Sequence, residues 1–365
     1  MPPKRRNQEP EVDPLLPFYR ARGALFGLAV GDAMGATTEF KALPAPSFPD
    51  LCDGPQTGLL GRGPHNVEKG QVTDDTHMAV CLAESLCTLG GYDGHDALQR
   101  YREWLPHAFD AGNLTREVLS VEGPRPIQER ASLEAWLRSG RRSAGNGSLM
   151  RTAPIGVWFH EAGQQEWRIR ASLADAALTH YDPRCQLAGV ALNASIAAAI
   201  RGGPDVDADQ MVEAAERELL IGAPILTRDH EDLMVEVAEA AELLRGDLRA
   251  ARHDDPELYG PDLHLTQSNK AGFVRAAFRL AYWELFHAPN VAAALIDVTN
   301  RGGDADTNAA ITGALLGARD GEEALPLEWR QTVLEALRGR PRDPFWYRYH
   351  PRLLIRLADL RMGRG

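Results

Sequence analysis

Apolar residues recur at helical spacing along most of the chain. After Thr76, Met78, Cys81, Leu82 and Leu86 fall three or four residues apart, which places them on one face of a helix. The pair Gly90-Gly91 favours a helix end. Similar patterns predict helices over about 95–107, 127–139, 165–179, 185–200, 207–220, 231–246, 270–287, 290–299, 307–318 and 327–338. Strand-like alternation is almost absent, so the sequence predicts a compact all-α fold of a dozen or so helices.

The helical pattern that begins at Phe18 contains four glycines at four-residue spacing. Each lowers helix propensity by about 1 kcal/mol relative to alanine, so four in register need a compensating gain. On one helix face they form a groove that a second helix can approach closely. The sequence therefore predicts a tightly packed central helix with Asp32 among the glycines Gly23, Gly27, Gly31 and Gly35.

The remaining segments define the expected domain organisation. Residues 1–17 carry five prolines and are predicted to form a flexible N-terminal extension. Residues 18–365 are predicted to form a single domain. Within it, residues 40–72 are rich in Gly and Pro and indicate a long loop of the functional or disordered kind, and the acidic stretch 203–262 could be an insertion.

Net charge, cysteine content and the length of apolar runs limit the classes of protein to which the chain can belong. The 365 residues carry a formal net charge of -11, which argues against a protein that binds nucleic acid through its phosphates. The one basic cluster, Lys4-Arg5-Arg6, is either a solvated end or a partner-binding arm. The four cysteines form no CxxC pair and indicate reduced thiols. With no secretory signal and no apolar run long enough to span a bilayer, we expect a cytoplasmic protein.

Two helix starts far apart in the sequence each carry two aspartates and a threonine. One aspartate or threonine can cap a helix, and carboxylates are favoured near a helix N-terminus, so capping is the simplest interpretation of either cluster. A cap needs only one oxygen, however, and each cluster adjoins a Gly-rich helix. The clusters are Thr73, Asp74 and Asp75, and Asp304, Asp306 and Thr307.

If the two helix starts converge, four carboxylates share a small volume and repel one another unless a cation compensates. Oxygen donors without His or Cys favour a hard ion such as Mg²⁺ or Mn²⁺. Six such groups suit two metals about 4 Å apart, which can hold substrate hydroxyls and orient an attacking water.

Four motifs, in this order, resemble those of the ADP-ribosylglycohydrolases. They are "GLAVGDAMGATTEF" (27–40), "TDDT" (73–76), "GNGSLMR" (145–151) and "GGDADTNAA" (302–310). The likeness covers roughly residues 18–320 and is strongest toward the bacterial dinitrogenase reductase-activating glycohydrolase branch. Ala305 stands where many relatives carry Thr. The resemblance implies an all-α bundle, a site for two Mg²⁺ or Mn²⁺ ions, and removal of ADP-ribose from a modified protein side chain.

The resemblance also implies roles for individual residues. The two clusters above match the metal ligands, and Glu39 matches a glutamate that acts as a base, positions water or gates the site. Asn146, Gly147 and Ser148 match a loop at the diphosphate of ADP-ribose, although Asn-Gly is also an ordinary turn sequence. Each of the remaining matches also has a purely structural interpretation: core packing for Met150 and Phe273, a helix cap for Asp110 and a structural histidine for His180. The resemblance places Met150 and Phe273 at the adenine, Asp110 near the departing side chain, and His180 at the substrate.

The function predicted from these matches is a metal-dependent ADP-ribosyl hydrolase, with arginine as the expected acceptor. One alternative is an immunity protein that also binds and neutralises an ADP-ribosylating toxin through its N-terminal extension. Another is an inactive ADP-ribose binder, which the complete set of ligand-type residues disfavours.

Overall fold

A computed structural model describes residues 13–41 and 52–363 of the chain. The described residues form α-helices joined by short 3₁₀ turns and loops, with only isolated β-bridges between them, so the predicted all-α fold is confirmed. The helices run Leu16–Gly35 (α1), Asp74–Leu89 (α2), Gly94–Trp104 (α3), Asn113–Leu119 (α4), Arg125–Arg138 (α5), Ala153–Trp158 (α6), Gln165–Ala177 (α7), Pro183–Arg201 (α8), Ala208–Asp229 (α9), Met234–Ala250 (α10), Val274–His287 (α11), Val291–Arg301 (α12), Ala305–Asp320 (α13), Leu327–Glu335 (α14), Pro344–Tyr347 (α15) and Pro351–Arg361 (α16).

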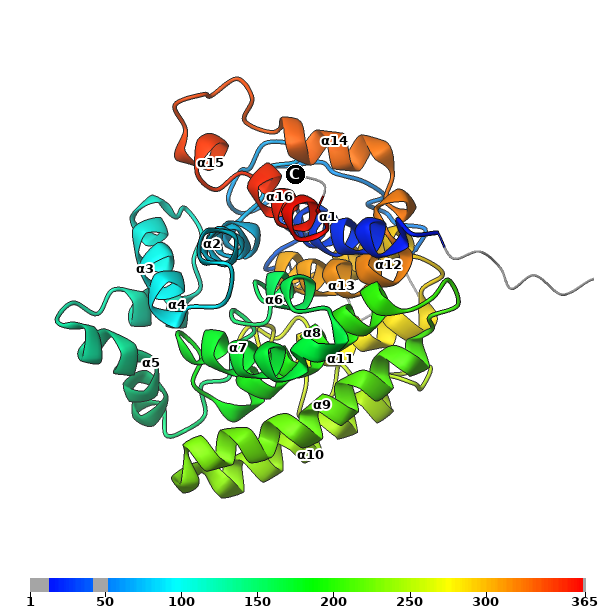
Figure 1. Ribbon diagram of the computed structural model, residues 1–365. Coiled ribbons are helices and arrows are strands. Elements are labelled where there is room, and N and C mark those ends of the chain that lie inside the picture. Colours follow the sequence, from blue (N-terminus) through cyan, green and yellow to red (C-terminus); the bar gives the residue numbers. More distant parts are fainter. Residues whose placement is uncertain (1–12, 42–51, 364–365) are drawn as a thin grey trace, which may run out of the picture.

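Helices α1 and α13 lie side by side at the centre of the molecule, and the other helices surround them (Figure 1). Helices α11 and α12 pack on α13, while α16 packs on both α1 and α2. On the other side, α8 contacts α6, α7, α9 and α10. Helices α9 and α10, from the acidic 203–262 stretch, bury Met211, Leu219, Leu244 and Leu248 in the main hydrophobic core.

The glycine stripe of α1 packs against α13 with backbone touching backbone, as the four-residue spacing predicted. A Cβ placed on Gly27 would lie 1.9 Å from the carbonyl oxygen of Gly313, and one on Gly23 would lie 2.2 Å from that of Gly317. Where α1 ends and α13 begins, a Cβ on Gly35 would lie 2.3 Å from the carbonyl oxygen of Ala305. The glycines therefore set the distance between the two helices.

Several boundaries differ from the predicted ones. Helix α1 begins at Leu16, so the last two residues of the predicted 1–17 extension are helical, and residues 1–12 lie outside the described residues. Helix α11 begins at Val274 rather than near residue 270, because residues 266–273 form a loop at the site. Helices α4 and α6 are only seven and six residues long, too short to give a periodic signal.

No helix among the described residues is long and apolar enough to cross a membrane.

Candidate active site

The starts of α2 and α13 open onto one cavity of about 480 Å³. Segments from seven parts of the chain line it, and most of the predicted site residues are among them. Those residues are Glu39, Asp74, Asp110, Asn146, Gly147, Met150, His180, Asp304, Asp306 and Thr307. Four predicted residues are not among the lining residues: Thr73, Asp75, Ser148 and Phe273.

The start of α2 is capped from the neighbouring helix, not by its own aspartates. The Asp32 carboxylate on α1 accepts hydrogen bonds from the backbone N–H of Thr73 (2.9 Å) and of Thr76 (3.0 Å), and from both threonine hydroxyls. This arrangement satisfies two of the backbone donors that a helix start leaves unpaired, those of Thr73 and Thr76. The Asp74 and Asp75 carboxylates are therefore not needed as caps, which removes the simplest structural explanation for the pair.

The aspartate before α13 does not cap its own helix either. Asp304, the residue just before α13, makes no side-chain cap hydrogen bond, and its carboxylate instead accepts a hydrogen bond from the Asn146 amide at 2.7 Å. The Asp306 carboxylate accepts from the backbone N–H of Thr307 at 2.9 Å, and the Thr307 hydroxyl points at the Met150 sulfur at 3.9 Å. Both helix starts thus direct carboxylates into the cavity.

Glu39 is attached to the α13 start through the backbone. The Phe40 N–H donates to the Gly303 carbonyl (2.7 Å), and the Gly303 N–H donates to the Lys41 carbonyl (2.9 Å). Phe40 adopts a φ of 59°, a left-handed conformation that an aromatic residue rarely takes. This turn brings carboxylate oxygens of Glu39, Asp304 and Asp306 within 4.8 Å of one another.

Burial and mutual repulsion raise the carboxylate pKa values in the cavity. Burial comes first for each group. The negative charges of Asp110, Asp304 and Asp74 add to it and raise the pKa of Glu39 to about 9. For Asp75, burial and the charge of Asp32 likewise raise the pKa well above its usual range. Such a cluster favours protons or a cation.

The donor chemistry fits hard divalent cations. The donors at the two helix starts and Glu39 are all oxygens, the preferred ligands of Mg²⁺ and Mn²⁺. The Asp75 Oδ1 atom is buried and has no hydrogen-bond partner among the described residues. An oxygen left without a partner at this depth is costly, and a bound ion would satisfy it.

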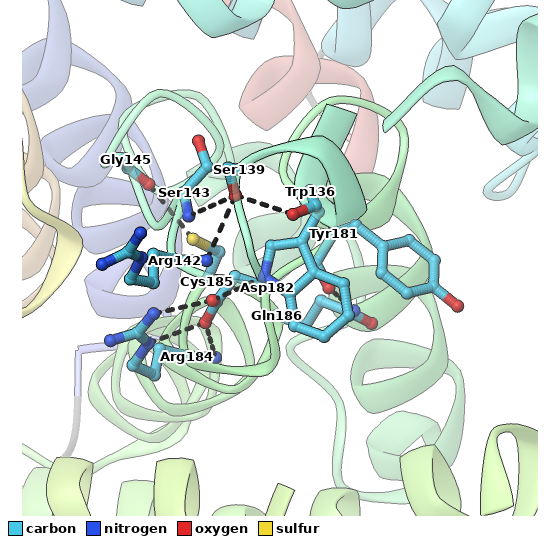
Figure 2. Close-up of polar contacts among 10 residues, drawn as sticks. All are labelled: Trp136, Ser139, Arg142, Ser143, Gly145, Tyr181, Asp182, Arg184, Cys185 and Gln186. Carbon is cyan, nitrogen blue, oxygen red and sulfur yellow. Dashed lines mark hydrogen bonds and ion pairs between the residues drawn. The ribbon is translucent and has the colours of Figure 1, made fainter. Parts of the chain in front are cut away.

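The 144–148 loop is fixed on both sides. The Asn146 N–H donates to the Gly272 carbonyl and the Val274 N–H to the Ala144 carbonyl, both at 3.0 Å. From α8, the Cys185 thiol donates to the Gly145 carbonyl at 3.2 Å, as Figure 2 shows. The loop is therefore held rigidly at the cavity wall.

The segment that leads into this loop is also anchored (Figure 2). Ser139, at the end of α5, accepts hydrogen bonds from the backbone N–H groups of Arg142 and Ser143. The Trp136 indole donates to Asp182, which caps α8 and pairs with Arg184. These contacts link the loop to two helices far from each other in sequence.

His180 explains one glycine of the loop. A Cβ on Gly147 would lie 2.9 Å from the His180 ring, and the other side of this imidazole contacts the Thr179 hydroxyl through Nδ1 at 2.8 Å. Burial lowers the pKa of His180 to about 3, so the ring is neutral. The Phe273 ring lies under the Arg184 guanidinium at 5.4 Å, whereas Met150 faces the cavity.

Sequence reasoning missed two contributors. His65, in the long loop before α2, places its Nε2 atom 3.2 Å from a Glu39 oxygen and 3.3 Å from an Asp110 oxygen. The long Gly- and Pro-rich loop was expected to be functional or disordered, but no spacing or motif within it pointed to this histidine. The second is the 266–272 segment, predicted in part as helix, which contributes Thr266, Ser268 and Gly272 to the cavity wall.

The fold and cavity define a class: an all-α protein in which the starts of α2 and α13 direct carboxylates into one cavity. The chain belongs to the ADP-ribosylglycohydrolase family, whose family profile matches residues 14–360. The family resemblance noted in the sequence is thereby confirmed.

Individual relatives cover most of the chain. An ADP-ribosyl-dinitrogen reductase glycohydrolase of Rhodospirillum rubrum is 29% identical over 85% of this chain and 88% of its own length. The ADP-ribosylarginine hydrolase Tri1 of Pseudomonas putida is 27% identical over 86% of this chain and 74% of its own. A solved structure described as an ADP-ribosylglycohydrolase-related protein complex matches with a TM-score of 0.62 and 26% identity, covering 94% of this chain and 99% of that one.

Proposed function

We propose that this chain is a metal-dependent ADP-ribosyl hydrolase that removes ADP-ribose from an arginine side chain of a modified protein. The observation that carries the proposal is the meeting of the α2 and α13 starts, with Glu39, Asp110 and Asn146, around one cavity. Relatives described as acting on ADP-ribosylarginine and on ADP-ribosyl-dinitrogen reductase support the choice of substrate.

In this proposal, the chain would hold two Mg²⁺ or Mn²⁺ ions through Asp74, Asp304, Asp306 and Thr307, which line the cavity, and through Thr73 and Asp75, on either side of Asp74. Bound ions of this kind orient ribose hydroxyls and make a nearby water more nucleophilic. Asn146 fixes the Asp304 carboxylate by a 2.7 Å hydrogen bond, and Asp32 fixes the start of α2. The chain thus supplies two rigid sets of oxygens before substrate arrives, which reduces the ordering required at the reacting centre.

The cavity walls would position the two ends of the substrate. In this proposal, the Gly147 backbone at the cavity wall and the following Ser148 would offer N–H groups to the diphosphate, and Met150 would offer an apolar surface to the adenine. Asp110 and Glu39 line the same cavity, and in this proposal they would face the departing guanidinium. Both carboxylates can accept its N–H donors, and this preference for a positive leaving group supports arginine over serine.

The decisive test compares arginine-linked and serine-linked ADP-ribosyl peptides, with Mg²⁺, with Mn²⁺ and with chelator. We expect release of ADP-ribose from the arginine-linked peptide, lost on chelation. Asp304→Ala should lower turnover by more than about 100-fold, because losing a mere outer-shell partner already costs 10–100-fold at metal sites. Asp209→Ala, an exposed aspartate in the first turn of α9, is the matched control and should behave as wild type. Near-normal turnover by Asp304→Ala, or activity that survives thorough chelation, would reject the proposal.

The immunity function through residues 1–17 stays a prediction, since residues 1–12 lie outside the described part of the chain. Deleting residues 1–12 and measuring both hydrolysis and toxin protection separates it from the hydrolase function.

A further inference from the structure

His65 lies at the tip of a tight turn against the site. Arg62 and Val67 pair through both backbone hydrogen bonds, at 2.6 and 2.9 Å, and so close the turn around His65. Gly63, with a φ of 66°, lets the turn approach the end of α1, where a Cβ would lie 2.0 Å from the Ala36 carbonyl oxygen. The backbone of the turn that carries His65 is therefore held against the end of α1.

The imidazole Nε2 lies between two carboxylates. It is 3.2 Å from Glu39 Oε2 and 3.3 Å from Asp110 Oδ2. Neither the His65 Nε2 atom nor the Glu39 Oε2 atom has a hydrogen-bond partner among the described residues, and the Glu39 side chain is only 3% exposed. A deeply buried carboxylate oxygen without a hydrogen-bond partner is thus aimed at a nitrogen that is also without one.

We propose that Glu39, His65 and Asp110 form a third metal site, selective for Zn²⁺ over the hard ions of the main site. Zinc binds His nitrogen and carboxylate oxygen at about 2.0–2.2 Å, and two ligands at tetrahedral angles then lie about 3.3–3.5 Å apart. The two distances from His65 are close to that separation. All three ligand atoms lie within 4.8 Å of one another, a gap that rotation of either carboxylate can shorten.

The donor set determines which ion binds where. The main site offers oxygens alone, which suit Mg²⁺ and Mn²⁺, whereas the imidazole nitrogen shifts preference toward Zn²⁺. Three protein ligands with a fourth position open to the cavity form the arrangement in which zinc keeps a water or takes a ligand. The His65 side chain is 21% exposed, so the ion can reach it from solvent.

Zinc at this site would block the proposed reaction. It would occupy Glu39 and Asp110, the carboxylates assigned above to the departing guanidinium, and place a positive charge where that cation must leave. We therefore expect zinc to inhibit the enzyme even when Mg²⁺ is saturating. This inhibition rests on the proposed function, whereas zinc binding itself does not.

The binding test uses the full, untagged chain with saturating Mg²⁺ to fill the oxygen sites. Titration with Zn²⁺ alone, followed by calorimetry, should show one equivalent bound. His65→Phe keeps an aromatic ring between Phe40 and Phe109, whose ring centroids lie 6.2 and 6.0 Å from that of His65, and so should fold normally. It should weaken zinc binding by more than about 100-fold, and His65→Gln should do the same. His95→Phe is the matched control, because His95 faces a single carboxylate, Glu129, at 3.8 Å.

Two results would overturn the zinc site. One is the absence of zinc binding to the Mg²⁺-loaded wild type, which would leave His65 as a residue that only orients Glu39 and Asp110. The other is equal zinc affinity in wild type and His65→Phe. If zinc binds as expected but does not inhibit, the site stands and the role assigned to Glu39 and Asp110 in the reaction fails.

Discussion

The contact between α1 and α13 makes a sharp prediction about Gly27→Ala. A Cβ at residue 27 would lie 1.9 Å from the Gly313 carbonyl oxygen, whereas ordinary contact begins at 3.4 Å. The helix pair must therefore separate by about 1.5 Å, and a gap even smaller than that forfeits a quarter to a half of the dispersion energy of each contact. Because the clashing atom belongs to the backbone, no rotamer change relieves it.

The magnitude follows from two opposing effects. Overpacking in a close-packed core costs about 1–3 kcal/mol, with more expected where backbone must move. Alanine regains about 1 kcal/mol of helix propensity over glycine. Because the clashing atom is backbone, we take the cost at the upper end of that range, about 3 kcal/mol or more. After the propensity gain of about 1 kcal/mol, the expected net loss in the free energy of unfolding is about 2 kcal/mol or more, which urea denaturation followed by far-UV circular dichroism measures.

Gly246→Ala in α10 is the matched control. It is the same chemical change inside a helix, but a Cβ there would meet only the end of the Arg249 side chain at 3.9 Å. Helix propensity alone should then raise the stability by up to about 1 kcal/mol. Two variants that shift the urea midpoint in the same direction would refute the claim that the α1 glycines are set by contact with α13.

Three further predictions concern the site. Gly35→Ala should lower activity more than Gly27→Ala does, because its Cβ would lie 2.3 Å from the carbonyl oxygen of Ala305, which lies between the proposed metal ligands Asp304 and Asp306. Measurements of kcat and Mn²⁺ affinity test this, and unchanged values would contradict it. Asp32→Ala should lower the free energy of unfolding in urea by about 3 kcal/mol or more, because four hydrogen-bond donors at the start of α2 lose their buried carboxylate acceptor. It should also reduce metal affinity. A variant as stable as wild type would count against the capping of α2 by Asp32. The raised pKa values mean that the metal-free folded chain binds more protons than the unfolded chain from about pH 4 upward, so its stability should fall as pH rises toward 9. Because metal binding needs deprotonated carboxylates, the rise in Tm on adding Mg²⁺ should be larger at about pH 8 than at about pH 6. Equal rises at the two pH values would refute the claim that burial and mutual repulsion raise the pKa values of these carboxylates.

Much of the fold was readable from the sequence because it depends on local periodicity. The apolar stripe of α2 and the four-residue glycine spacing of α1 each have a strong signal, and both are confirmed. Helices α4 and α6 were not predicted, because one or two helical turns are too short to show a repeating apolar pattern and their positions depend on tertiary contacts. The start of α11 was misplaced because a propensity pattern cannot show where a loop is needed for the cavity wall.

The candidate site was partly predictable for a similar reason. The doubled aspartates stood out because a cap needs only one oxygen, and the structure brings Asp74 of the first set and all three residues of the second to one cavity. What the sequence could not show is that Asp32, not an aspartate of the pair, caps α2. Nor could it show that a turn of the long loop carries His65 to Glu39, because that contact joins residues on separate segments through backbone packing alone.

The backbone contact between α1 and α13 also limits how this site can change. The smallest side chain that can be added, one methyl group, already exceeds the available space at each of the four α1 glycines. The position of the α13 carboxylates relative to α1, whose Asp32 holds the start of α2, therefore cannot drift gradually through substitutions at these glycines. A descendant or an engineered variant with a different metal preference would have to exchange the ligand side chains themselves and keep the helix pair as it is.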